Sequence, residues 1–437
     1  MRKQPKITPP EHLTHQTLAI VEQRRTYDLI TPLYGGGVNT TEPDAITIVR
    51  ATEVRGQLRF WWRVMRGGQS AGERPLKERE DAIWGKAYEK NDTGIPQEQT
   101  IQISVDPDPS RRGKAIKPFE VQRRRPRSIN GIPGYAAFPL QPDQKELQKA
   151  QPLIPDLWEG VRFTLTITYP TRWREEIEAA LWAWETFGGL GARTRRGFGA
   201  LTLLEVQEGA PEVPSVPAVL PTAQGVERWI RDGIEKHLKE GTFPSGIPHL
   251  SRNLQFVVLP AMDRPMQAWN ALIRKLQDFR LQKEVHNRSA WPEADAIRKI
   301  ARKSTKNMPA TPQTFPRAAF GLPIIFHFTG DDAPDDHTLN EANMQGEDGA
   351  HKERFASPLI LRPLLCRDNR AVGLALLLEG SRVDVKHLIL EDGRKVPHSV
   401  EGSFQAREIP SLTDQMPMIR NETDVLQAFL KFCKGVK

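Results

Sequence analysis

The sequence is poor in cysteine and has no long apolar run. Its 437 residues include two cysteines, Cys366 and Cys433, without the paired spacing of a zinc site. We therefore expect neither structural zinc nor a disulfide framework. No segment reaches the roughly 18 apolar residues that span a bilayer, and residues 1–10 lack the apolar core of a signal peptide. These absences lead us to expect a cytoplasmic protein with no membrane partner, no metal and no other cofactor.

Acidic residues are almost missing from two arginine-rich stretches. Residues 110–127 hold eight Lys or Arg against the single acid Glu120, and residues 188–199 hold three arginines and no acid. A two-metal nuclease site needs clustered carboxylates, so neither stretch supports one. Over the whole chain, 62 Lys and Arg outnumber 54 Asp and Glu, which gives a net charge of +8. This balance favours polyanionic partners, with simple solubility as the alternative.

The stretch 188–199 combines five glycines with its three arginines. Glycine admits positive φ and lets backbone N–H groups approach a ligand closely, and guanidinium groups match phosphate oxygens. The stretch is neither a Walker loop nor a dinucleotide fingerprint, because a helix enters it and a strand leaves it. It predicts a loop that binds RNA phosphates and carries one residue, Phe198, that stacks on a base. The predicted phosphate contacts are Gly189, Gly191, Arg193, Arg195 and Arg196.

A second glycine cluster lies after the strand predicted over residues 24–30. Its members, Gly35, Gly36 and Gly37, mark a loose loop or a point of ligand approach. Both glycine clusters are therefore candidate RNA contacts.

A helix is predicted over residues 52–66, with an apolar face that includes Trp61 and Trp62 and a neighbouring arginine stripe. We expect both tryptophans, like Trp184, to pack in the core. The stripe has no acid for i,i+4 pairing, so its charges repel one another unless an anion lies against them. We expect RNA to supply that anion, with a solvated face as the alternative; the stripe consists of Arg55, Arg59, Arg63 and Arg66.

Residues 110–127 contain prolines and flanking glycines, which favour a loop or arm over a helix. Such basic arms often become ordered only on nucleic acid. We expect RNA contacts at Arg123, Arg124 and Arg125. A localisation signal or plain disorder is the alternative.

The remaining pattern alternates strands and helices twice. In the first half we expect strands at 100–105, 161–169 and 200–206, and helices at 74–88 and 172–187, the latter capped by Thr171 and Gly188. In the second half we expect strands at 254–259 and 322–328, a hairpin of 357–365 with 371–378, and helices at 266–282, 294–303 and 425–432. The acidic segment 331–353 should be a mobile loop that points away from any RNA groove.

This order fits an α+β protein with two ferredoxin-like domains of the split βαβ kind and loop insertions. The segment 209–222, rich in proline and valine, lies at the predicted boundary between residues 1–210 and residues 211–437.

Three motifs together resemble one family: Thr-Pro-Leu-Tyr-Gly-Gly-Gly at 31–37, Val-Arg-Gly-Gln-Leu-Arg-Phe-Trp-Trp-Arg at 54–63, and the glycine loop at 188–199. The chain resembles the RAMP superfamily of CRISPR proteins, and specifically the first-numbered subunit of the type III-B (Cmr) effector complex. This resemblance implies two RRM-like domains of the RAMP type. It also implies other RAMP subunits as partners and an antiviral role, holding the 3′ part of the guide CRISPR RNA and helping to capture target RNA.

Some RAMP relatives cut RNA, so a metal-independent endoribonuclease that processes CRISPR RNA is the rival hypothesis. It needs a general base such as histidine, and the candidates His12 and His15 lie in a polar stretch. Asp28 and Glu53 have simpler interpretations, as a strand-edge acid and a first-turn helix acid. The resemblance assigns target cleavage to another subunit, so we expect a non-catalytic RNA-binding subunit.

Overall fold

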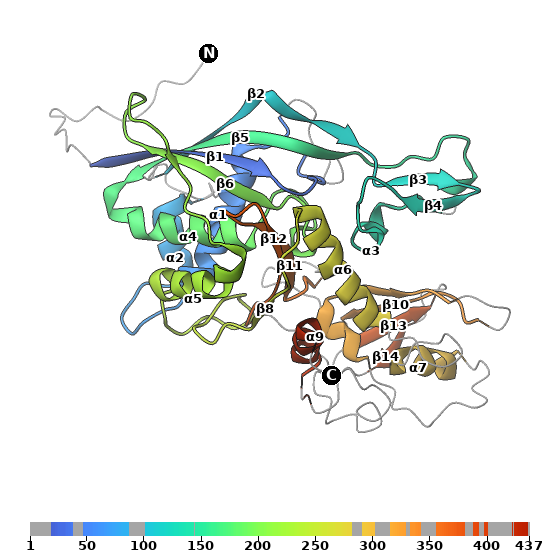
Figure 1. Cartoon of the computed structure of the whole chain (residues 1–437). Helices are drawn as coiled ribbons and strands as arrows, with labels where there is room; N and C mark the ends of the chain where they lie inside the picture. Colours follow the sequence, from blue (N-terminus) through green and yellow to red (C-terminus); the bar gives the residue numbers. More distant parts are fainter. Residues whose placement is uncertain are drawn as a thin grey trace, which may run out of the picture.

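The computed structural model describes most of the chain, in segments that carry three sheets and a short hairpin (Figure 1). The described residues are 19–37, 47–86, 101–143, 145–281, 291–301, 315–328, 333–341, 355–380, 388–392, 397–400, 422 and 424–435.

The first sheet has the strand order β2-β5-β1-β6-β7, and its neighbouring strands are antiparallel. Helix α1 (Ala51–Arg66) follows β1, and helix α4 (Arg174–Phe187) follows β5. Without β7, this is the β-α-β-β-α-β order and strand arrangement of a ferredoxin-like unit, which confirms the predicted fold class. Its strands are β1 (Ile20–Leu29), β2 (Gln102–Ile116), β5 (Leu157–Pro170), β6 (Leu201–Glu208) and β7 (Val216–Pro217).

Alternation of side chains explains why the central strands bury one face. Tyr27 of β1 and Phe163 of β5 are buried, and their rings stack at 5.3 Å. On the other face, Asp28 accepts two hydrogen bonds from Arg162, at 2.7 and 2.8 Å, as expected of a strand-edge acid. The helices α1, α2 (Leu76–Trp84), α4 and α5 (Val226–His237) lie on one side of this sheet (Figure 1).

The second sheet has the order β11-β12-β8. The predicted hairpin is confirmed, because β11 (Leu359–Leu365) and β12 (Ala371–Leu377) pair along their whole length. Strand β8 (Phe256–Val258), helix α6 (Pro265–Leu281) and helix α9 (Val425–Lys434) complete this unit. Its elements follow the ferredoxin-like order as far as the second helix.

A third sheet, of order β14-β13-β10-β9, is inserted into the second unit. Strands β9 (Ile324–Phe326) and β10 (His337–Glu341) lie between α6 and β11 in the chain, and β13 (Leu388–Asp392) and β14 (Pro397–Val400) lie between β12 and α9. Helix α7 (Pro292–Ile300) packs on its core. Strand β10 falls inside the segment predicted as a mobile loop, so that prediction is wrong for residues 337–341. The acids there did not prevent a strand because Leu339 is buried against the core. The rest of the acidic segment, apart from residues 333–336, lies outside the described residues.

The predicted basic arm is also built of strands. Strand β2 continues to Ile116 along β5, and β3 (Phe119–Gln122) forms a hairpin with β4 (Arg125–Ser128). Of the two prolines that led us to expect a loop, Pro118 lies between β2 and β3, and Pro126 lies in β4 opposite Val121. The hairpin lies beyond the ends of β2 and β5, beside α3 (Gly134–Ala137) (Figure 1). We call residues 111–140 the basic arm.

Two details of the first unit differ from the sequence prediction. Thr171 does not cap α4, because a 3-10 turn at Thr171–Trp173 precedes the helix and the Thr171 hydroxyl donates to the Ala19 carbonyl. Gly188 is extended rather than left-handed, with φ −93°.

Helix α5 was not predicted. Strand β7 lies after residue 210 yet pairs with β6, and the division at residue 210 stays a prediction.

Candidate nucleic-acid interface

The glycine loop, residues 188–199, packs against residues 31–34. The Gly199 amide donates to the Pro32 carbonyl at 2.9 Å, and the Ala192 amide donates to the Tyr34 carbonyl at 2.6 Å. Five of the loop's other ten amides also have protein acceptors, so those groups are already engaged and do not form an open phosphate cradle; they belong to Gly188, Leu190, Gly191, Arg196 and Gly197.

Close backbone approach explains the glycine spacing of this loop. A Cβ at Gly191 would lie 2.3 Å from the Tyr34 carbonyl oxygen, and one at Gly199 would lie 2.0 Å from the Leu190 carbonyl oxygen. A Cβ at Gly189 would lie 2.9 Å from the Gly199 carbonyl oxygen. The glycines are therefore needed for packing within the protein, and contact of Gly189 and Gly191 with RNA stays a prediction.

Arg195 and Arg196 point into the second half of the chain. Arg195 donates to the Ser357 carbonyl, and Arg196 donates to the Leu359 carbonyl at 2.9 Å. Burial lowers the pKa of Arg195, and it lowers the pKa of Arg196 to about 9, with a contribution from Arg280. Both arginines therefore hold the glycine loop to the strand β11 and the residues before it.

Arg362 of β11 makes the reciprocal contact. Its side chain is fully buried, and it donates to the carbonyls of Thr186 and Leu201, at the end of α4 and the start of β6. Burial lowers its pKa to about 9, so the guanidinium remains charged at neutral pH. Arginines from each half thus bind backbone carbonyls of the other half, and we call this set the arginine ties.

We expect Arg362→Met to destabilise the chain by about 3 kcal/mol, because two buried carbonyls would lose a charged donor. Urea unfolding followed by circular dichroism measures the change. Arg367→Met is the matched control, since Arg367 is exposed and its loss should change stability by no more than about 0.5 kcal/mol. Equal stability of the two variants would contradict the tie.

Phe198 is a core residue, and its predicted stacking on RNA bases is wrong. Its side chain is 0% exposed, and its ring meets the edge of Trp269 at 4.9 Å. A side chain that is enclosed by protein has no face left for a base. The prediction that Trp61, Trp62 and Trp184 pack in the core is confirmed, because all three are buried in the hydrophobic cluster beneath the first sheet.

The arginine stripe of α1 finds its anions within the protein. Arg59 and Arg63 both donate to Glu80 of α2, at 2.7 and 2.6 Å. Arg66 donates to Glu176 of α4 at 2.8 Å. The stripe therefore needs no RNA to relieve its repulsion, contrary to our argument from the helix alone.

Arg59, Arg63 and Arg66 each reach a carboxylate, whereas the partners of Arg55 among the described residues are backbone carbonyls. Arg55 donates to those of Trp84 and Ile101, at 3.0 and 3.1 Å. Burial, aided by the neighbouring Arg59, lowers its pKa. Contact of the four stripe arginines with RNA stays a prediction.

The glycine triplet keeps its amides available. Gly35 and Gly36 have φ of 67° and 91°, and within the described segments no acceptor lies on the N–H groups of Gly35, Gly36 and Gly37. Arg50 donates to the Gly37 carbonyl at 3.1 Å. Of the predicted backbone contacts, this triplet fits an incoming phosphate best.

Glu53 joins the triplet, α1 and the glycine loop. Its Oε1 accepts the Gly191 amide, while its Oε2 is buried without a partner. A Cβ at Gly36 would lie 3.2 Å from that Oε2. Burial raises the pKa of Glu53 to about 7, against the opposing effects of the Gly191 amide and Arg50. The predicted place of Glu53 in the first turn of the helix is confirmed. The sequence did not show that its carboxyl accepts a hydrogen bond from the glycine loop.

We expect Glu53→Gln to flatten the dependence of stability on pH. The folded chain holds the Glu53 proton to higher pH than the unfolded chain does. The contribution of Glu53 to stability is therefore fully present below the ordinary glutamate pKa and is lost as pH rises through about 7. Relative to wild type, the variant should gain about 2 kcal/mol between pH 5 and pH 8. Urea unfolding at several pH values measures this.

The control for this experiment is Glu175→Gln, which removes an exposed carboxylate. Its pH profile should follow that of the wild type. A Glu53→Gln profile parallel to the wild type would mean that Glu53 is charged throughout this range, which would contradict its assigned environment.

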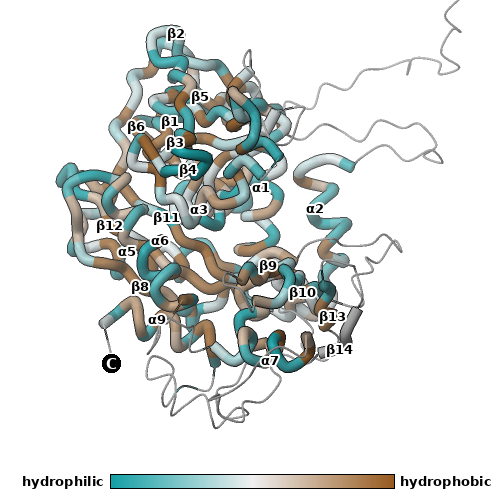
Figure 2. The backbone as a smooth tube through the Cα atoms, turned by 90° about the vertical axis from the view of Figure 1, so that its right-hand side faces the viewer, coloured by the Kyte–Doolittle hydropathy of each residue, from teal (hydrophilic) through white to brown (hydrophobic). Residues whose placement is uncertain are grey.

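The tip of the basic arm is the least neutralised of the predicted contacts. Arg123 and Arg124 form the turn between β3 and β4, with φ of 50° and 60°, and Arg125 follows them. All three are exposed, and no acid partner lies near them in the described part of the chain. We call these three residues the arginine turn. Figure 2 shows the contrast between the hydrophilic β4 and the apolar β11.

Other cations of the arm do have acidic neighbours. Lys114 lies 3.0 Å from Glu159, and Lys117 lies 2.9 Å from Asp156. These contacts are exposed and screened by solvent, so they compete weakly with a polyanion. Arg193 of the glycine loop reaches the same region and donates to the Ala136 carbonyl of α3 at 2.9 Å. The structure thus brings Arg193 and the arm together.

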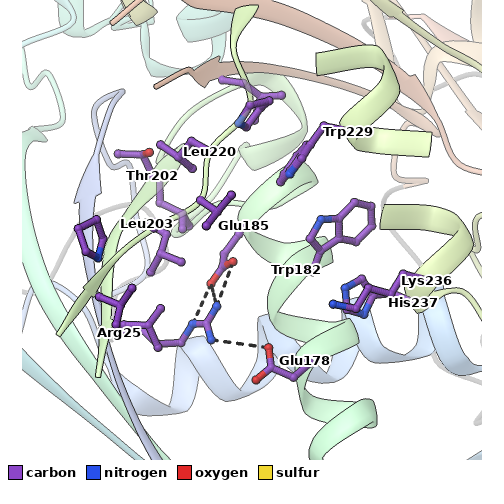
Figure 3. Close-up of a pocket in the computed structure, with 18 of the residues that line it drawn as sticks. Arg25, Glu178, Trp182, Glu185, Thr202, Leu203, Leu220, Trp229, Lys236 and His237 are labelled. Atoms are coloured by element: carbon purple, nitrogen blue, oxygen red, sulfur yellow. Dashed lines mark hydrogen bonds and ion pairs between the residues drawn. The ribbon is translucent and has the colours of Figure 1, made fainter. Parts of the chain in front are cut away.

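A cavity of about 840 Å³ lies away from the arginine turn, between α4, α5, β6 and the segment 216–221 (Figure 3). Its aromatic wall includes Trp182, which stacks on His237 at 5.4 Å. Burial lowers the pKa of His237 to about 4, with contributions from Lys236 and Arg66, so its imidazole is neutral at pH 7. Of the residues predicted to bind RNA, Arg66 lines this cavity.

The floor of the cavity is a closed polar network (Figure 3). Arg25 donates to Glu185 at 3.1 Å, and the Tyr27 hydroxyl donates to the same carboxylate at 2.6 Å. Burial and the nearby Glu185 charge raise the pKa of Tyr27, and burial raises the pKa of Glu185 against the effect of Arg25. Because these groups satisfy one another, the cavity offers mainly apolar contacts.

The candidate bases His12 and His15 lie outside the described residues. Within those residues, no group of three or more His, Cys, Asp and Glu is placed to hold a metal ion. In the same segments no helix combines the length and apolar character that crossing a membrane requires.

Residues 26–202 match the model of the RAMP superfamily, which confirms the resemblance predicted from the motifs of the first half. The chain is similar to the crystal structure of apo Cmr1 from Pyrococcus furiosus, with 16% identity, coverage of 84% of this chain and 90% of that one, and a TM-score of 0.45. It is also similar to a chain in the cryo-EM structure of type III-B Cmr-beta bound to cognate target RNA, with 12% identity, coverage of 95% and 100%, and a TM-score of 0.46. No curated protein matches the sequence.

Proposed function

We propose that this chain, whose residues 26–202 match the RAMP superfamily, is a non-catalytic RNA-binding subunit of a cytoplasmic type III-B CRISPR effector. In this role it contacts guide CRISPR RNA and target RNA beside other RAMP subunits. Its place at the 3′ end of the guide rests on the resemblance of the motif at 54–63. The observation that carries the RNA-binding role is the arginine turn, a set of exposed cations without acidic partners at the tip of the basic arm.

The chemistry of the arginine turn suits backbone recognition. Guanidinium groups bind phosphate oxygens, and phosphate contacts position RNA without reading its sequence. The hairpin fixes the turn, since Gln122 pairs with Arg125. The ordered hairpin therefore presents three cations together without a loss of loop entropy on binding.

The open face of the first sheet supports this choice of surface. RNA-binding sheets of the RRM kind stack bases on aromatic side chains. Over residues 22–28 of β1 and 162–168 of β5, the positions that alternate with the buried ones are instead Glu22, Arg24, Thr26, Asp28, Arg162, Thr164, Thr166 and Thr168. Trp158, nearer the start of β5, is half-buried and packs against the core of the first unit. Because none of the alternating residues over these two ranges is aromatic, we assign the first contacts to the basic arm.

We expect the full chain to bind single-stranded RNA with an affinity that falls steeply with salt. Replacing Arg123, Arg124 and Arg125 by alanine should weaken binding to unrelated sequences equally. It should also lower the slope of log affinity against log salt by about 2, because each lost phosphate contact removes about 0.7 for single strands. Fluorescence anisotropy at several salt concentrations measures both.

The control is a triple variant with the same loss of charge, Lys77→Ala, Arg228→Ala and Arg252→Ala, at exposed positions that have acidic neighbours. It should keep the wild-type slope. Equal effects of the two triple variants would show that binding follows net charge, not the arm. Absence of salt-dependent binding by the wild type would overturn the proposal.

The endoribonuclease alternative makes an opposite prediction. Labelled repeat RNA incubated with the full chain in the presence of a chelator should stay intact if the chain only binds. Cleavage that disappears in His12→Ala or His15→Ala would establish the enzyme instead.

A further inference from the structure

We infer that Phe138, which directly follows the helix α3 that packs on the hairpin of the arginine turn, is a base-stacking residue on whose ring an unpaired RNA base lies. The inference rests on the proposed RNA-binding function and names the residue that adds a base contact to the phosphate contacts of the arm. The sequence of the glycine loop predicted this role for Phe198, which the fold buries.

Among the exposed large apolar residues of the described segments, Phe138 is distinguished by being aromatic. Its residue is 57% exposed, whereas the other large apolar residues that are exposed in the described segments are aliphatic. An aliphatic side chain offers a base only apolar area, but an aromatic ring offers a π-face. Phe138 is therefore the exposed residue of this set with the chemistry that stacking needs.

The backbone holds this ring in place. Phe138 begins a 3-10 turn, Phe138–Leu140, directly after α3. Its neighbours Ala137 and Leu140 are buried in the hydrophobic cluster that includes Phe198 and Trp269. The Phe138 carbonyl accepts the Gln141 amide at 3.1 Å. A ring on a fixed turn loses little conformational freedom when a base binds to it.

The helix that precedes Phe138 contacts two arginine-bearing segments. Helix α3 packs on the hairpin, because a Cβ at Gly134 would lie 3.3 Å from the Ser128 Cβ at the end of β4. On its other side, Arg193 donates to the Ala136 carbonyl at 2.9 Å. Helix α3, which Phe138 follows directly, thus contacts both the hairpin that carries the arginine turn and an arginine of the glycine loop. Single-strand binding surfaces combine such cations and aromatic faces.

An apolar contact with a protein partner is the competing explanation for an exposed phenylalanine. The two differ in what they require of the side chain. A protein contact needs apolar area, which leucine keeps, whereas stacking needs a planar ring that tyrosine keeps. The comparison of Phe138→Leu with Phe138→Tyr separates the two.

The experiment measures the affinity of the full chain for single-stranded RNA and for a blunt RNA duplex by anisotropy. We expect Phe138→Ala and Phe138→Leu to weaken single-strand binding by about 5- to 100-fold, the range for loss of one stacked base. We expect Phe138→Tyr to stay within about 2-fold of wild type. The salt slope should not change, because no charge is lost, and duplex binding should not change, because paired bases are not available.

Leu153→Ala is the matched control, since Leu153 is a 70% exposed apolar residue that follows the arm in sequence; it should bind as the wild type does. Wild-type affinity in Phe138→Ala, or affinity retained in Phe138→Leu, would overturn the stacking assignment while salt-dependent binding by the wild type upholds the proposed function. Failure of the wild type to bind RNA would overturn both. Circular dichroism of each variant confirms folding.

Discussion

The two halves of the chain depend on charged donors that meet backbone carbonyls. Arg195 and Arg196 reach from the glycine loop to residues 357 and 359, and Arg362 reaches back to the first unit. A buried arginine is costly unless acceptors offset the loss of water around its guanidinium; Arg362 has acceptors for both Nη groups, while its Nε is buried without one. Peptide carbonyls meet this need only at a fixed backbone position, so the arginine ties require the glycine loop and β11 to keep one geometry. The packing of Gly197 against Trp269 of α6 depends on the same alignment.

Much of the fold could be predicted because its signals are local. The alternation around Phe163, the apolar stripe of α1 and the hairpin of β11 with β12 each follow from residues close in sequence. The basic arm and β10 were missed because prolines and acids are local signals against strands. In both places tertiary pairing decided the outcome, with β5 extending β2 and β13 pairing with β10.

The candidate site was harder to predict because its signals are ambiguous. Glycines at 189, 191 and 199 predict close approach of something to the backbone, and in this fold that partner is the protein's own chain. The acid that pairs with Arg59 and Arg63 is Glu80, which belongs to another helix and is invisible to an i,i+4 search. Exposure is likewise a tertiary property, so the sequence could not tell that Phe198 is buried and Phe138 is exposed.

The order of elements along the second half constrains when this half can fold. Its core contains Phe279 of α6 and Phe429 of α9, whose rings meet at 5.4 Å. The third sheet is assembled from strands on both sides of the β11–β12 hairpin. During synthesis, α6 must therefore wait with an apolar face uncovered until the segment 425–434 leaves the ribosome, whereas every strand of the first sheet is available by residue 217. The first sheet can thus have all its strands while β11 and β12, which place Ile360 and Leu374 in the same core as Phe163, are still being made.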